Sequence, residues 1–267
     1  MTNTVANLVM LAQLSQKEVR KKILHTWEAS HEWVIPIHIG PVDLSIDKTI
    51  WFLFMGTAIT FFILFIGSRL LKDRPGAYQV IVEDTFNFGR NHIAGQQGED
   101  GRKIYPYTLT LFVFILTLNL IGLVPNSYPV TSSISFTLTL ALATLLITQY
   151  FAFRRNGVVG YYKSFAPPGI PKLMIPFIAG LELVQEYVTK PLTLGLRLYA
   201  NMLAGHLLIF VFLSLILTFG IPVAAVSVPM AVLIYAFEIF VSIIQAYIFA
   251  ILSQVYIEQA MFASEAH

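Results

Sequence analysis

The sequence of 267 residues contains no cysteine and few charged side chains. Without cysteine the chain cannot form disulfides, thiol nucleophiles or thiolate metal sites. Only 12% of its residues are charged, against about 25% in soluble domains. It also lacks a glycine-rich phosphate loop, a nucleophile elbow and a metal-spaced cluster of His, Asp and Glu. These absences give no support to catalysis on a soluble substrate, and we expect no metal and no cofactor.

Hydrophobic residues, in contrast, make up 56% of the sequence and are grouped in long runs. About 20 apolar residues in a helix cross the hydrocarbon core of a bilayer. We therefore predict an all-α integral membrane protein in contact with lipid, with spans at residues 50–71, 104–125 and 131–153. Residues 72–103 mix charged and apolar residues, as an interfacial amphipathic helix does. Residues 1–49 are predicted to be a polar tail, and residues 50–267 a single membrane domain.

Two segments near the C-terminus are too long to be ordinary spans. As helices, residues 173–219 and 222–256 would measure roughly 70 Å and 52 Å, against a hydrocarbon thickness of about 30 Å. Either each segment breaks into two spans, or both are strongly tilted and form a long hairpin that turns near Gly220 and Pro222. The chain is therefore expected to contain about five to six helices.

The basic residues indicate the orientation in the membrane. Residues 69–103 and 154–172 hold ten Lys and Arg, whereas the segment before the first span holds five and the turn at residues 126–130 none. The positive-inside rule therefore favours an inside position for the two basic loops and an outside position for the N-terminus. A net charge of only +2 gives no indication of a nucleic-acid partner.

Charged and amide side chains interrupt both long segments. A charge at membrane depth costs about 2.5 to 3.5 kcal/mol and must face protein, water or another charge. At 100° per residue, the charged and amide residues of the first segment form one stripe within about 60° of Arg197, while His206 lies on the opposite face. The second segment has its own stripe. The members of the two stripes are Glu182, Glu186, Lys190, Arg197 and Asn201, and Glu238, Ser242 and Gln245.

A hairpin that turns near Gly220 would place Arg197 level with Gln245, and His206 level with Glu238. Arginine does not release its proton in proteins, so Arg197 is a fixed cation, whereas His and Glu can be tuned to relay protons. Other interpretations are a structural hydrogen bond between His206 and Glu238 and a structural ion pair at Arg197. Glu182, Glu186 and Lys190 could simply pair along one helix. Asn119 and Gln149 could line a channel or hold helices together.

Residues 181–208, LELVQEYVTKPLTLGLRLYANMLAGHLL, resemble the signature of the a subunit of F-type ATP synthases. Residues 243–260 resemble the closing helix of that family, and NLIGLVP at residues 119–125 resembles the exit of its second span. The likeness covers nearly the whole chain after the tail. It implies a hairpin of helices that lie nearly parallel to the membrane, which favours the tilted alternative.

The resemblance also implies roles for individual residues. Arg197 would be the stator arginine that faces the carboxylates of a rotating c-ring, with Asn201 and Gln245 beside it. His206 and Glu238 would occupy positions in two aqueous half-channels that lead protons to and from the ring. The chain would then be a non-catalytic, proton-translocating subunit that couples proton flow to rotation and ATP synthesis.

The expected partners are the c-ring and b-type subunits of the peripheral stalk. The expected location is the bacterial inner (plasma) membrane, with the mitochondrial inner membrane as the alternative. A secondary transporter or channel would also explain charges at membrane depth, but it would usually contain internal repeats, which are not visible here. A purely structural anchor would not need aligned charges in the membrane.

Overall fold

The computed structural model describes residues 38–39, 42–43, 48–69, 98–124, 127–165, 171, 173–219 and 221–263. The predicted interfacial helix at residues 72–103 lies outside the described residues except for its last six, which begin a long helix. Most of the predicted tail, residues 1–49, also lies outside them. Within it the structure describes two short strands that pair in antiparallel fashion, β1 (His38–Ile39) and β2 (Val42–Asp43).

The rest of the described chain is helical, and five of its segments are long and apolar enough to cross a membrane. The prediction of an all-α integral membrane protein is confirmed. In chain order the elements are α2 (Lys48–Arg69), α4 (Gly98–Leu123), the 3-10 helix η3 (Val130–Ser132), α5 (Ile134–Lys163), α6 (Ile175–Val184), the π-helix η4 (Gln185–Thr189), α7 (Lys190–Phe219) and α8 (Ile221–Phe262).

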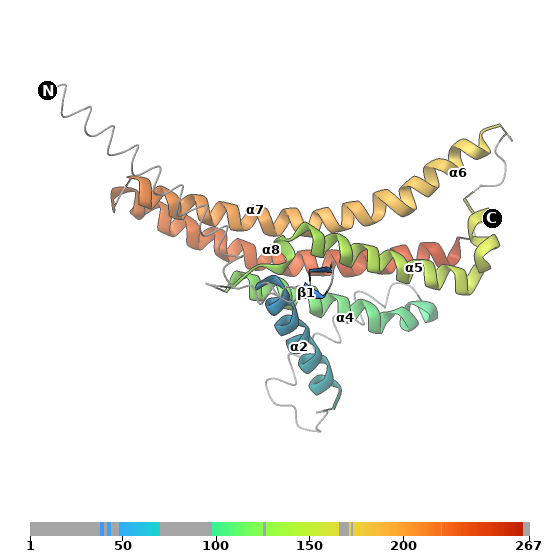
Figure 1. The fold of residues 1–267 in the computed structure, drawn as a ribbon, viewed down its shortest axis with the longest axis horizontal. Coiled ribbons are helices and arrows are strands. Elements are labelled where there is room, and N and C mark those ends of the chain that lie inside the picture. The colour runs from blue at the N-terminus through green and yellow to red at the C-terminus, as the bar shows by residue number, and fades with distance from the viewer. Residues whose placement is uncertain are drawn as a thin grey trace.

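Helices α7 and α8 run side by side in opposite directions and form the long hairpin (Figure 1). With 42 residues, α8 measures about 63 Å, about twice the hydrocarbon thickness. It is not broken into two spans, although Pro229 lies inside it. Such a helix fits a bilayer only when it is strongly tilted.

The other arm of the hairpin is a continuous bow made of α6, η4 and α7 (Figure 1). Its concave side faces away from α5 and α8. The π turn at Gln185–Thr189 joins α6 to α7 and bends the helix there, as π turns inside α-helices do.

Helix α5 continues to Lys163, ten residues beyond the predicted end at residue 153. It changes direction at Gly157, whose φ of 67° lies in the left-handed region that glycine tolerates. Beyond this kink, Tyr161 is buried against Phe153 and Phe165. The kink therefore returns the end of α5 to the protein instead of letting it continue in a straight line.

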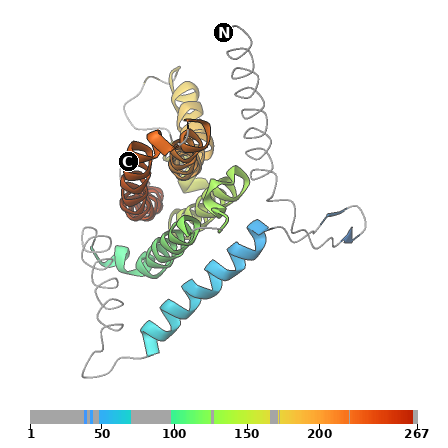
Figure 2. The same cartoon turned by 90° about the vertical axis from the view of Figure 1, so that its left-hand side faces the viewer.

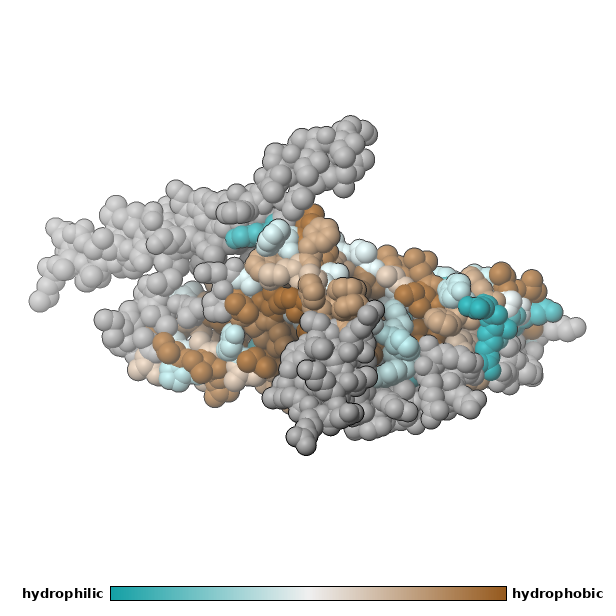
Figure 3. Space-filling model, turned by 90° about the horizontal axis from the view of Figure 1, so that it is seen from below, coloured by the Kyte–Doolittle hydropathy of each residue, from teal (hydrophilic) through white to brown (hydrophobic). Residues whose placement is uncertain are grey.

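The main hydrophobic core lies between α4, α5, α7 and α8. Helix α2 stands apart from the α7–α8 pair and packs against α4 (Figure 2), where Gly56 leaves room for Leu118. Hydrophobic residues cover much of the described surface, with a hydrophilic patch at one end (Figure 3). Such a surface suits a protein whose solvent is lipid.

Candidate functional site

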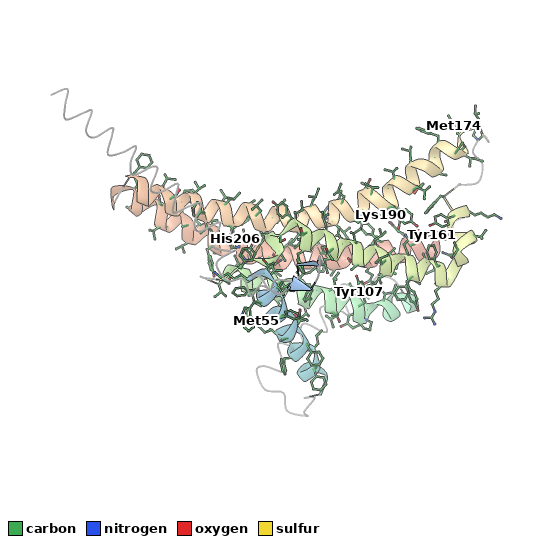
Figure 4. The ribbon with its side chains drawn as sticks, in the orientation of Figure 1. Met55, Tyr107, Tyr161, Met174, Lys190 and His206 are labelled. Atoms are coloured by element: carbon green, nitrogen blue, oxygen red, sulfur yellow. The ribbon has the colours of Figure 1, made fainter. Side chains whose placement is uncertain are left out.

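The polar residues of the long hairpin fall into two groups along α7, one near the middle of the helix and one at its N-terminal end. Figure 4 labels one member of each, His206 and Lys190, on the same helix. We call the first the turn-side group, because it lies toward the α4–α5 and α7–α8 turns, and the second the loop-side group, because it lies toward the basic α5–α6 loop. About 30 Å of helix separates His206 from Glu186.

The turn-side group is built by α7 and α8. The Asn201 Nδ2 atom donates a hydrogen bond of 2.7 Å to Gln245 Oε1. One turn further along, the Glu238 carboxylate packs against Gly205, where the absence of a side chain leaves it room. Glu238 is 4% exposed and Gln245 3% exposed, so both are inside the protein. The group therefore places a carboxylate, amides and a neighbouring imidazole, that of His206, at one depth.

Asn119 belongs to the same group. The Tyr235 hydroxyl donates to the Leu123 carbonyl oxygen at 3.0 Å, which fixes the end of α4 against α8. One turn before Leu123, Asn119 therefore lies level with the turn of α8 that carries Glu238 and Ser242. Its side chain is buried.

Several buried polar atoms on the turn side have no hydrogen-bond partner within the described residues. They are Asn119 Oδ1, Thr131 Oγ1, His206 Nε2, Ser242 Oγ and Gln245 Nε2. Buried polar groups normally have partners, and water supplies them where protein does not. The turn-side group is therefore suited to hold water.

The loop-side group surrounds Glu186, which is 6% exposed. The Lys190 ammonium forms an ion pair with the Glu186 carboxylate one turn away. Gln149 Nε2 on α5 donates to Glu186 Oε1 at 3.4 Å and to the Tyr161 hydroxyl at 3.3 Å. On the other side of the ion pair, Lys190 Nζ lies 5.0 Å from the centre of the Tyr256 ring.

A chain of hydroxyls connects this group to the surface. The Tyr187 hydroxyl donates to Gln149 Oε1 at 3.1 Å, and the Tyr162 and Tyr187 hydroxyls are 2.8 Å apart. Tyr162 is exposed. The sequence prediction omitted Tyr161, Tyr162, Tyr187 and Tyr256. The apolar and aromatic residues that continue after Arg155 are the sequence feature that could have revealed Tyr161 and Tyr162.

A small, partly open cavity lies beside the loop-side ion pair. Its volume of about 10 Å³ is close to what one water molecule requires, and Thr144, Thr148, Glu186 and Lys190 line part of it. An open groove of about 570 Å³ lies on the outer side, lined by Gln185, Thr189, Lys190 and Gln259 among others. Lys190 and Tyr256 line both spaces, so these two side chains lie between the cavity and the groove.

Arg197 lies between the two groups, on the exposed face of α7. Glu186 pairs with Lys190, so within the described part of the chain it does not form the ion pair with Arg197 that the sequence left open. Glu182 is exposed on α6. After Lys190, Arg197 is the only Lys, Arg, Asp or Glu residue of α7. An uncovered arginine in hydrocarbon is costly, which indicates that something polar covers it.

The structure divides most of the predicted site residues between the two groups, and their partners differ from those expected. Gln245 bonds to Asn201, one turn from Arg197, with which it was expected to be level. The Glu238 carboxylate lies against the residue that precedes His206, close to the expected level. Among the described residues, no three His, Cys, Asp or Glu side chains converge in a way that could hold a metal ion.

Gly205→Ala should destabilise the contact between α7 and α8. An added methyl group would collide with the Glu238 carboxylate, and such overpacking typically costs about 1 to 3 kcal/mol. We expect a lower Tm for the purified protein in detergent. Gly180→Ala is the control, because a methyl group there meets no atom within 4 Å. Equal Tm values for the two variants would contradict the close packing of Glu238 against α7.

The fold and the two polar groups define an integral membrane protein that holds charged and titratable side chains at membrane depth. The family model described as ATP synthase A chain matches residues 49–258. The chain belongs to this family, whose members take part in ATP synthesis and proton transport.

Curated relatives agree over nearly the full length. ATP synthase subunit a of Rubrobacter xylanophilus is 64% identical over 258 residues, which are 96% of this chain and 100% of that protein. ATP synthase subunit a of Hyphomonas neptunium is 35% identical over 250 residues, covering 91% and 97% of the two chains. That of Rhizobium rhizogenes is 32% identical over 234 residues, covering 85% and 93%. The chain is a bacterial membrane protein.

Proposed function

We propose that the chain is the stator subunit that carries protons to and from the c-ring of an F-type ATP synthase in the bacterial inner membrane. The observation that carries this proposal is the arrangement along α7. One water-suited group lies near the middle of α7 and the other at its N-terminal end, and one exposed fixed cation, Arg197, lies between them. A proton can enter such a protein from either side but has no continuous polar route through it.

The turn-side group would form one half-channel, in which Glu238 and His206 relay protons and Asn119, Asn201, Ser242 and Gln245 hold water. The loop-side group would form the other, with Glu186 and Lys190 at its inner end. The exposed Glu182 would lie near its mouth. Carboxylate and imidazole groups can gain and lose protons near neutral pH when their surroundings favour it, whereas amides and hydroxyls orient water.

The c-ring would cover the exposed face of α7. Apart from Arg197 and Thr193 the exposed residues of this face are apolar, among them Leu192, Leu196, Leu207 and Leu208, and the bow gives the face a concave shape (Figure 1). A round rotor with neutral carboxylic acids could roll along such a face. Near Arg197 the ionised form of a ring carboxylate is favoured, so its proton leaves into one half-channel and is replaced from the other.

The b-type subunits of the peripheral stalk would need a different face. Helix α2 offers one, since its large aromatic residues Trp51, Phe54, Phe61 and Phe62 are exposed and lie on a helix apart from the α7–α8 pair (Figure 2). Apolar helices of partner subunits pack on such a surface in a membrane. The assignment of α2 to the stalk is part of the proposal.

The absence of native cysteine allows a direct test of the two half-channels. We expect Ser242→Cys to react with a membrane-impermeant methanethiosulfonate reagent from the turn side only, and Thr148→Cys from the loop side only. Sealed vesicles of both orientations, containing the assembled complex, give the side of access. Thr60→Cys, buried at the α2–α4 contact, is the unreactive control. Access to both cysteines from the same side would refute the proposal.

A further inference from the structure

We propose that a block of apolar side chains closes the interior route between the two polar groups, so that Arg197 guards only the exposed face. We call this block the apolar seal. It consists of Leu194, Leu198, Ala246, Phe249 and Ala250. The inference rests on the proposed function, because a seal matters only if protons reach both of its sides.

The position of the seal follows from the contacts that border it. On the turn side the border is the hydrogen bond between Asn201 and Gln245. On the loop side it is Lys190, which pairs with Glu186 and lies over Tyr256. Between Lys190 and Asn201, α7 rises by about 16 Å. The inward-facing residues in this interval, Leu194 and Leu198, are 2% and 0% exposed.

The seal is closed on the sides that face the protein. Phe112 and Ile115 of α4 and Ala141 of α5 belong to the same buried cluster. Leu194 and Ala141 also line the small cavity beside Glu186 and Lys190. The water-sized space of the loop side therefore ends where the seal begins.

The hydroxyls of Thr137 on α5 and Ser253 on α8 already act as donors to backbone carbonyl oxygens. Thr137 donates to the carbonyl oxygens of Ser133 and Ile134, and Ser253 donates to that of Phe249. Of the buried polar atoms without partners that define the turn-side group, Gln245 Nε2 lies at the border of the seal and the others lie beyond it. An ion or a water chain in the seal would therefore meet only apolar atoms, and the loss of hydration would not be compensated.

Arg197 cannot perform this role, because its side chain is on the exposed face while the seal is on the buried face of the same helix. The two barriers therefore act on two routes. The charge repels cations at the surface where the rotor would lie, and the apolar residues keep the interior dry. Loss of either barrier should produce a different defect.

The test measures proton leak through a complex whose rotor cannot turn. Assembled complexes in vesicles are treated with dicyclohexylcarbodiimide, which modifies buried carboxylic acids such as those of the ring. A potassium diffusion potential then drives protons, and a pH-sensitive dye records their entry. Leu198→Asn puts an amide of similar size into the seal. Leu198→Met is its apolar control, and Ile257→Asn is the positional control, because Ile257 is equally buried but outside the seal.

We expect Leu198→Asn to leak at least about tenfold faster than Leu198→Met, since one hydrogen bond to water contributes about 1.4 kcal/mol and that is a factor of ten. Ile257→Asn should not leak. Because a buried amide can impair assembly, the milder pair Leu198→Thr and Leu198→Val is measured as well. These two side chains share a shape and differ by one hydroxyl group, so a several-fold difference in leak is expected.

The proposal is overturned if neither polar variant leaks faster than its apolar counterpart in vesicles with equal amounts of complex. It is also overturned if Ile257→Asn leaks as much as Leu198→Asn. Failure of the proposed function has another signature. Untreated wild-type vesicles would then show no proton flow coupled to ATP synthesis, independently of any leak through the seal variants.

Discussion

Arg197→Ala is expected to abolish proton-driven ATP synthesis while the complex still assembles. The side chain is exposed and makes no ion pair with Glu186, so its removal leaves the packing of α7 intact. What is lost is the only fixed charge of α7 between the two polar groups. Ring carboxylates that pass this point would then stay protonated and release nothing. ATP synthesis driven by an imposed pH gradient, measured in vesicles, gives the result.

Thr193→Ala is the matched control, because Thr193 is exposed on α7 one turn before Arg197 and its hydroxyl bonds only to carbonyl groups of its own helix. It should retain nearly full activity. If Arg197→Ala also synthesises ATP at the rate of the wild type with equal amounts of complex in the membrane, the stator role of this residue is refuted.

Glu238→Gln should reduce proton translocation by about 100-fold or more, which is the contribution typical of a group that transfers protons. Glutamine has the same shape and can occupy the space beside Gly205. It cannot take up and release a proton, so the turn-side group would keep its water but lose its relay. The rate of ATP-driven proton pumping into inverted vesicles is the appropriate measurement, because it requires the same path in the reverse direction.

The control for this variant is Glu258→Gln, the same substitution on the same helix. Glu258 accepts a hydrogen bond from Gln254 at 3.2 Å and belongs to neither polar group. We expect a change of less than about threefold, consistent with the small cost of a partly buried hydrogen bond. Equal losses in the two variants would show that the substitution acts through stability and not through proton transfer.

The architecture could be predicted from the sequence because its main determinants are local. Runs of about 20 apolar residues require helices in lipid, and the lengths of the last two segments require tilt. The kink at Gly157 was missed. Arg154 and Arg155 precede it and resemble the end of a span, whereas the structure continues the helix and turns it back at this glycine.

The pairing of α7 with α8 was predictable to within about one turn. Counting from a turn at Gly220 places Gln245 level with Arg197, while the structure joins Gln245 to Asn201. A small shift of one packed helix along the other produces a difference of this size, and no sequence pattern determines such a shift. Gly205 fixes it in the structure, because the Glu238 carboxylate fits only where α7 lacks a side chain.

The loop-side group was the least predictable part. Helical angles counted on a regular α-helix put Glu182 and Glu186 on one stripe with Arg197. In the structure Glu182 and Arg197 are exposed while Glu186 is buried. Glu186 lies inside the π turn at Gln185–Thr189, which accommodates more residues than an α turn does and so shifts the angular positions counted on a regular α-helix. Nothing in the composition of QEYVT indicates it.

This π turn makes the site depend on chain length as well as on chemistry. Deleting Val188, the one residue of Gln185–Thr189 without a polar side-chain group, would restore regular α geometry and rotate α6 about its own axis by roughly 100° relative to α7. Glu186 would then turn away from Gln149, although no charge or polar group had been removed. A one-residue change in spacing can thus separate the loop-side carboxylate from its partners. The number of residues in the π turn therefore determines the site together with the side chains.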